Sequence, residues 1–115
     1  MAAIEVVHSG DRDTWRALVN PPGAIPSGGR ERDVFASADG VFTTGLWERE
    51  PDTWSFERPY HEVSIILEGE ADIEEPDGTL HTVRAGDVLV TPKGAKGTWH
   101  IRQKLVKFYA IVDQG

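Results

Sequence analysis

Turn residues at short intervals are the feature that most restricts the fold of this chain. Four turn-like triplets follow residue 33, namely Ala38-Asp39-Gly40, Pro76-Asp77-Gly78, Ala85-Gly86-Asp87 and Pro92-Lys93-Gly94. Pro presets φ for a turn, and Gly accepts the positive φ that a tight reversal needs. The segments between the triplets are short and rich in β-branched and apolar residues. This pattern predicts an all-β sandwich or barrel.

The expected strands of this all-β unit can be placed by their apolar runs. They span residues 33–37, 41–50, 62–67, 70–75, 79–83, 88–91, 98–102 and 105–112. We expect Pro51-Asp52-Thr53 to form a loop and Gly69 to break the long run around it. No long helical period follows residue 20.

The N-terminal part has a different texture. Residues 1–32 have the pattern of an arm on a barrel formed by residues 33–115, in a chain that is one domain overall. Within the arm, residues 4–7 could form a short strand and residues 11–18 one or two helical turns, and the Pro and Gly residues at 22–29 predict a loop. Because so short an arm has no core of its own, we expect it to pack on the barrel or on a partner subunit.

Composition excludes several classes of function. The 115-residue chain has a formal net charge of −7, and its basic residues are scattered, which argues against a nucleic-acid surface. It has no Cys, so no disulfide, thiolate nucleophile or sulfur metal site is available. No apolar run reaches the roughly 20 residues of a membrane helix, and no secretory signal is visible at the N-terminus. We therefore expect a cytoplasmic protein that binds neither nucleic acid nor membrane.

Two spacings are the strongest motif signals. Glu62 and Gly69 are separated by seven positions, with Gly45 upstream. Further along, Gly86 is followed by Pro92-Lys93-Gly94. The order of these residues resembles the two motifs of the cupin superfamily. That resemblance implies an RmlC-like jelly roll, also called a double-stranded β-helix.

A finer resemblance covers about residues 33 to 112. The chain resembles the small single-domain cupins of the ureidoglycine aminohydrolase cupin-domain family (cupin type 3), which are also related to the ethanolamine-utilisation cupins. The matching pieces are Asp39-Gly40, Gly45-Leu46-Trp47-Glu48, Trp54, Glu62, Leu67-Glu68-Gly69, Asp77-Gly78, Gly86-Asp87, Pro92-Lys93-Gly94, Gly97-Thr98-Trp99, Lys107 and Tyr109. Since most members of this branch have no established activity, the resemblance implies a fold more firmly than a chemistry.

The resemblance also implies a metal site, but the chain has lost most of its ligands. The slots of the aminohydrolase ligands fall on Phe56, Arg58 and Glu62, and the last His slot of the second motif falls on Gly97. Phe56 cannot ligate and Arg58 would repel a cation, so we expect no metal cofactor and do not transfer the aminohydrolase reaction. The alternative is a metal held by Glu62 with His61 and a water, although adjacent residues of a regular strand point to opposite faces.

Strand alternation defines a candidate pocket. It puts Glu62, Ser64 and Ile66 on one face, which the family motif implies is the inward face. The candidate catalytic residues are Glu62 and Tyr109, and the candidate ligand-binding residues are Trp47, Trp54, Tyr60, Trp99 and Lys107. Aromatic walls with a few polar groups are typical of a small-molecule site.

The chemistry of this pocket depends on Glu62. If desolvation dominates, the pKa of Glu62 rises and the residue becomes a candidate general acid or base. If Lys107 is close, the pKa falls and the pair is structural. The plainer expectations are that Lys107 keeps its head in water and that Trp47 and Trp99 are core residues.

Three functions follow as hypotheses. The first is a small polar metabolite bound in the barrel, with metal-independent acid–base chemistry through Glu62 as an extension. The second is a metal-dependent cupin enzyme with non-standard ligands. The third is a non-enzymatic homodimeric binding or regulatory module, whose interface combines the N-terminal arm and an exposed strand. The sequence leaves open whether the protein is an enzyme and which ligand it takes.

Overall fold

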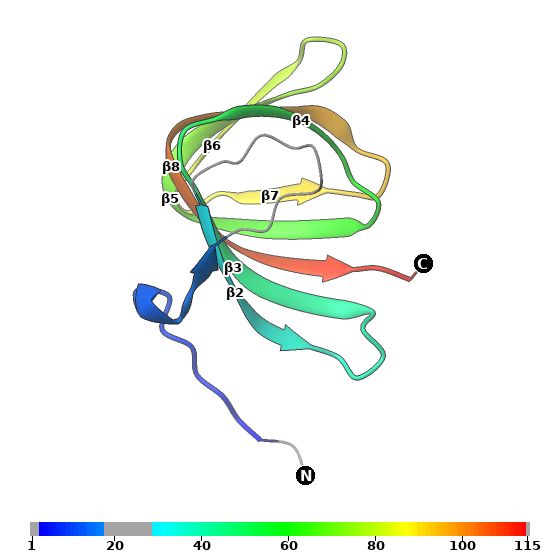
Figure 1. Ribbon diagram of the computed structural model, residues 1–115. Helices are drawn as coiled ribbons and strands as arrows, with labels where there is room; N and C mark the ends of the chain where they lie inside the picture. The colour runs from blue at the N-terminus through cyan, green and yellow to red at the C-terminus, as the bar shows by residue number, and fades with distance from the viewer. Residues whose placement is uncertain (1–2, 18–28, 115) are drawn as a thin grey trace.

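The long strands β5 and β8 organise the molecule, for which a computed structural model describes residues 3–17 and 29–114. The elements in chain order are η1 (Arg12–Thr14), β1 (Arg16–Ala17), β2 (Gly29–Ala36), β3 (Phe42–Arg49), β4 (Thr53–Glu57), β5 (His61–Glu74), β6 (Leu80–Arg84), β7 (Val88–Thr91) and β8 (Lys96–Val112). The strands curl into a barrel-like sheet, with the N-terminal segment on its outside (Figure 1). The prediction of an all-β barrel is confirmed.

Each long strand takes part in two half-sheets. The hydrogen-bonded order is β1-β2-β3-β8-β5-β6, with β4 on β8 and β7 on β5, and all pairs are antiparallel. The first half of β5 pairs with β7 and its second half with β6. The second half of β8 pairs with β3 and its first half with β4. A bend in both long strands therefore closes the sheet on itself.

Gly69 lies at the bend of β5. Its φ is +92°, and an added Cβ would lie 2.1 Å from the carbonyl oxygen of Lys104. The register between β5 and β8 shifts around this point, between Ile66 and Ala71. The predicted break at Gly69 is thus a bulge within one strand, and residues 98–102 and 105–112 likewise belong to one strand, because the ladder continues on both sides of the bend.

Other local predictions were wrong. Residues 4–7 form no strand, and residues 11–17 contain the short 3-10 helix η1 and the two-residue strand β1, while Leu18 lies outside the described residues. Strand β4 was not predicted, since Thr53 was assigned to a loop. It forms because its residues pair with Lys96–His100, 39 to 47 positions away. The predicted loop at 22–29 lies outside the described residues except Gly29, where β2 begins.

The interior of the barrel is an apolar cluster. Its buried members are Ile66, Ala71, Ile73, Val83, Trp99, Ile101 and Leu105. Burial alternates along the start of β5, where Glu62, Ser64 and Ile66 are buried and the residues between them are exposed. The predicted inward face of this strand is confirmed, so Glu62 points into the barrel.

The described part of the N-terminal arm packs on the outside of its own barrel. Trp15 joins Leu46 and Val106 in a second buried cluster. Beside it, the buried carboxylate of Glu48 is 2.8 Å from Arg30 Nε and 3.6 Å from Arg12 Nη1. Apolar contact and charge pairing together hold the arm in place.

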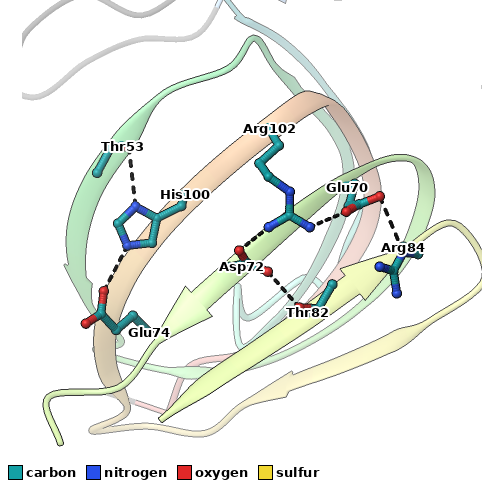
Figure 2. A network of polar contacts seen from close by, with 8 residues as sticks. All are labelled: Thr53, Glu70, Asp72, Glu74, Thr82, Arg84, His100 and Arg102. Atoms are coloured by element: carbon teal, nitrogen blue, oxygen red, sulfur yellow. Dashed lines mark hydrogen bonds and ion pairs between the residues drawn. The ribbon is translucent and has the colours of Figure 1, made fainter. Parts of the chain in front are cut away.

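Charged residues cover the outer surface of the other half-sheet (Figure 2). Arg102 on β8 pairs with both Glu70 and Asp72 on β5, and Arg84 on β6 approaches Glu70 at 3.3 Å. His100 pairs with Glu74 at 3.0 Å. These acids are therefore partnered by basic side chains on neighbouring strands, which agrees with a solvated hairpin and not a metal site.

No helix within residues 3–17 and 29–114 is long and apolar enough to cross a membrane.

Candidate functional site

The seven predicted site residues all line one cavity. Its volume is about 260 Å³, and its walls are Glu31, Trp47, Arg49, Trp54, Arg58, Tyr60, Glu62, Trp99, Lys107, Tyr109 and Ile111. Arg49, Arg58 and Glu31 are the charged wall residues that were not predicted as site residues. This volume is just under the usual range for small-molecule pockets.

Cross-strand register explains why these residues meet. Trp47 of β3 is the partner of Lys107 of β8, and Trp54 of β4 is the partner of Trp99. Cross-strand partners on one face have neighbouring side chains. The cavity therefore lies where β3, β4 and β5 face the same long strand, β8.

Glu62 is the most heavily partnered residue of the cavity. Its side chain is buried, and its Oε2 accepts hydrogen bonds from Lys107 Nζ at 2.8 Å, Ser64 Oγ at 3.1 Å and Arg58 Nη2 at 3.3 Å. Burial acts to raise the pKa of Glu62, but the charges of Lys107 and Arg58 outweigh it, and the net shift is downward. Of the two predicted alternatives, the close lysine is present, so Glu62 is a carboxylate at neutral pH.

Lys107 does not keep its head in water, contrary to the plainer expectation. The residue is only 4% exposed, and its Nζ lies 4.8 Å from the ring centroid of Trp47 and 5.3 Å from that of Trp99. Burial lowers the pKa of Lys107, and the nearby Arg58 adds to this, while Glu62 opposes it. The Lys107 side chain points from β8 into the barrel, so its ammonium group does not extend into solvent.

Arg58 was considered in the sequence only as a residue that would repel a metal. In the structure its Nε donates to Thr91 Oγ1 at 3.1 Å and its guanidinium lies over the ring of Phe56 at 4.8 Å. It thus holds a fixed position beside Glu62. The sequence feature that could have indicated this role is a basic residue at a position where the cupin resemblance implies a metal ligand.

Three tryptophans form the aromatic side of the cavity. The rings of Trp54 and Trp99 stack with centroids 5.8 Å apart and an interplanar angle of 10°, and Trp47 lies 6.1 Å from Trp54. Arg49 covers Trp54 at 3.7 Å and pairs with Asp52 at 3.0 Å. Trp99 is fully buried and belongs to the core, whereas Trp47 and Trp54 are partly exposed.

Two tyrosines supply hydroxyl groups. Burial, assisted by the acidic Glu31, raises the pKa of Tyr109 to about 12. Burial and Glu62 raise the pKa of Tyr60 as well. Both hydroxyls stay protonated at neutral pH, which suits hydrogen-bond donation better than proton abstraction. Gly45 makes room for Tyr109, because a Cβ there would lie 2.4 Å from the hydroxyl oxygen.

The residues of this cavity do not fit a divalent metal ion. Among the residues that the structure describes, no group of three or more His, Cys, Asp or Glu could hold one. Two cations already contact Glu62 where a metal would bind to it. His61 is exposed on the opposite face of β5, and its Nδ1 accepts from the backbone N–H of Lys93 at 3.0 Å. A His at position 97 would also lack room, since a Cβ there would lie 2.7 Å from the carbonyl oxygen of Glu74.

A larger hollow of about 840 Å³ lies along β6 and β7. Its walls are mainly aliphatic, and its charged side chains, such as Glu75, His81 and Asp87, belong to exposed residues. It therefore lacks the buried charge that distinguishes the barrel cavity.

Comparisons with known proteins agree with this fold. The family of EutQ-like cupin domains matches residues 36–109. A putative ethanolamine utilization protein Q from Salmonella typhimurium LT2 is similar at 23% identity and a TM-score of 0.69, covering 81% of this chain and 76% of its own. The Clostridium difficile EutQ protein is similar at 20% identity and a TM-score of 0.65, covering 76% and 69%.

A further solved structure is a DUF861 family protein from Thermotoga maritima, with 28% identity and a TM-score of 0.54 over 56% of this chain and 73% of its own. No curated protein matches the sequence well enough to carry an activity to it. The family match covers more than half of the chain, residues 36–109. The chain belongs to the family of EutQ-like cupin domains.

Proposed function

We propose that this protein binds a small polar metabolite in the barrel cavity without a metal ion. The observation that carries the proposal is the buried contact of Glu62 with Lys107 and Arg58 at the wall of a cavity. Buried charges are costly, and apolar residues of similar size often give equal or greater stability. Charged groups with shifted pKa values in a cleft are therefore candidates for function.

Binding ranks ahead of acid–base catalysis. A carboxylate that two cations hold in its ionised form is a weak base and has no proton to donate. Tyr109, the other candidate catalytic residue, is a hydrogen-bond donor in this account. Catalysis through Glu62 would need a ligand that separates it from Lys107.

We also propose kinship with the ureidoglycine aminohydrolase branch of cupins, limited to the fold. The aminohydrolase ligand slots hold Phe56 and Arg58 here, so the metal-dependent reaction is not part of the proposal. The metal content of the purified, untagged protein, measured by inductively coupled plasma mass spectrometry, tests this directly. We expect substoichiometric metal. One metal per chain would contradict the proposal and return Glu62 to the role of a ligand.

Ligand binding is tested by thermal stabilisation in the presence of small polar metabolites, with Arg58→Gln, which keeps the Glu62–Lys107 pair, as the comparison variant. A hit should stabilise the wild type and not Arg58→Gln. Stabilisation of both proteins to the same extent would place binding outside the barrel cavity.

A homodimer is the second part of the proposal. The outer face of β5 and β7 exposes two cross-strand apolar pairs, Val63 with Val90 and Ile65 with Val88, each residue 43–61% exposed. Since the described arm packs on its own barrel, this exposed sheet face is the better candidate interface. Light scattering after size-exclusion chromatography should give a dimer for the wild type and a monomer for Val63→Lys. Leu80→Lys, at a 60% exposed apolar site on β6, should remain dimeric.

A further inference from the structure

The buried charges of the cavity do not balance. Lys107 and Arg58 contribute two positive charges, and Glu62, which both contact, contributes one negative charge. The side chains of all three are at most 13% exposed. Two buried cations that share a single anion in a low-dielectric interior favour a second negative charge beside them.

The remaining charged groups of the cavity do not correct this excess. Glu31 is paired with Arg16 at 2.9 Å, and Arg16 also contacts Asp33 at 3.3 Å. The Asp33 side chain is 73% exposed and is not part of the cavity wall, so solvent screens its charge. Arg49 is paired with Asp52 at 3.0 Å, which makes a neutral pair. The excess of one positive charge therefore belongs to Lys107, Arg58 and Glu62, hereafter the charge triad.

Hydrogen bonding points the same way. A lysine ammonium has three protons to donate, and within the described residues the Lys107 side chain donates one hydrogen bond, to Glu62. Arg49 Nε is buried and has no acceptor within the described residues. The hydroxyls of Tyr60 and Tyr109, both protonated, add two more donors to the wall. The cavity is thus short of acceptors, which a ligand with anionic oxygens would supply.

The aromatic side and the size of the cavity restrict the rest of the ligand. Trp47 and Trp54 are both partly exposed in the cavity wall. Because Arg49 lies over the Trp54 ring at 3.7 Å and Trp99 stacks on it, a ligand would contact Trp54 at its edge and Trp47 at its ring. Flat, unsaturated groups pack well on such rings. A volume of about 260 Å³ leaves room for a small ring or a short chain.

We propose that the cavity selects small monoanions, with a carboxylate against Lys107 and Arg58 and a flat apolar body against Trp47 and Trp54. This inference rests on the proposed function and names its ligand class. Binding completes a group of two positive and two negative charges. It leaves Glu62 in place as the fixed anion that positions both cations.

Matched probes separate charge from shape. Benzoate, benzamide and benzylamine share one ring and carry an anionic, a neutral and a cationic group, and crotonate and crotonamide form a smaller pair. Quenching of tryptophan fluorescence and isothermal titration calorimetry would measure their binding. We expect at least one carboxylate to bind ten-fold or more tightly than its amide, and benzylamine not to bind.

Two variants link this preference to the charge triad. Lys107→Met leaves Glu62 and Arg58 as a neutral pair and should reduce the preference for carboxylate over amide to less than three-fold. Arg58→Gln should do the same if Lys107→Met fails to fold. Arg84→Gln, an exposed arginine on β6, is the matched control and should keep the wild-type preference.

The outcomes distinguish the inference from the proposed function. Amides or benzylamine that bind as well as the carboxylates would overturn the anion class and leave metabolite binding standing. A carboxylate preference that survives both Lys107→Met and Arg58→Gln would also overturn it. If none of these probes and no small polar metabolite bound at all, the proposed function itself would fail.

Discussion

Lys107 Nζ and Glu62 Oε2 lie 2.8 Å apart inside the barrel, although the two residues are 45 positions apart in the chain. Arg58 contacts the same carboxylate oxygen at 3.3 Å. Lys107 and Arg58 therefore contact the carboxylate oxygen through which Glu62 would otherwise bind a metal ion. These contacts and the packing around them have consequences for stability that can be measured.

Removing the anion of the charge triad should destabilise the protein strongly. Glu62→Gln leaves Lys107 and Arg58 buried together without a counter-charge, and breaking a buried ion pair in this way costs about 3 kcal/mol or more. Urea denaturation would measure the loss in the free energy of unfolding. The double variant Glu62→Gln with Lys107→Met should recover part of it. Glu57→Gln, on the exposed face of β4, should change stability by less than about 0.5 kcal/mol.

Lys107 should make stability increase with pH in the alkaline range. Its pKa is lowered in the folded protein, chiefly by burial. Between that lowered pKa and the ordinary value of about 10.4, the unfolded chain binds more protons than the folded one, so unfolding becomes harder as pH rises. Urea midpoints between pH 7 and 10 should rise in the wild type relative to Lys107→Met. Parallel curves for the two proteins would contradict a lowered pKa.

Gly45 should be required for the position of Tyr109. A Cβ at residue 45 would lie 2.4 Å from the Tyr109 hydroxyl and 2.9 Å from the carbonyl oxygen of Arg32. Gly45→Ala should therefore cost about 1–3 kcal/mol and shift Tyr109 away from the cavity wall. Near-ultraviolet circular dichroism and urea denaturation would detect both effects. Gly10→Ala, where a Cβ has nothing within 4 Å, is the control and should leave both measurements unchanged.

Glu48 should hold the N-terminal arm on the barrel. Its buried carboxylate is approached by Arg12, Arg30 and Lys104, at 3.6, 2.8 and 3.2 Å. Glu48→Gln leaves these cations without their shared anion, so the arm should detach more often. Trypsin should then cleave after Arg12 or Arg16 at least several-fold faster than in the wild type. Glu50→Gln, whose carboxylate is half exposed, should show the wild-type rate.

Local patterns were sufficient for much of the fold and for the membership of the site. The turn triplets and β-rich runs predicted an all-β sandwich or barrel, and the alternation of β5, together with the cupin resemblance, predicted that Glu62 faces inward. All seven predicted site residues line one cavity. The alternation of side chains between two faces is a property of each strand, so it can be predicted without knowing which strands lie beside it.

Strand β4, by contrast, could not be predicted from its own residues. The segment carries only a weak strand pattern and forms through its partner Lys96–His100. The same holds for the continuity of β5 through Gly69, which depends on the backbone of Lys104 being close by. Both features arise from pairing between distant segments.

The sequence by itself determined that the chain forms a β-barrel, which residues face its interior, and that most metal ligands of related proteins are missing. Only the tertiary structure decided that Lys107 is buried, that Glu62 is ionised, and that Arg58 completes a group with one excess positive charge. The physical reason is how far apart along the chain the interacting residues lie. Turns and alternation depend on neighbouring residues along the chain, whereas desolvation and ion pairing depend on atoms that only the closed barrel brings together.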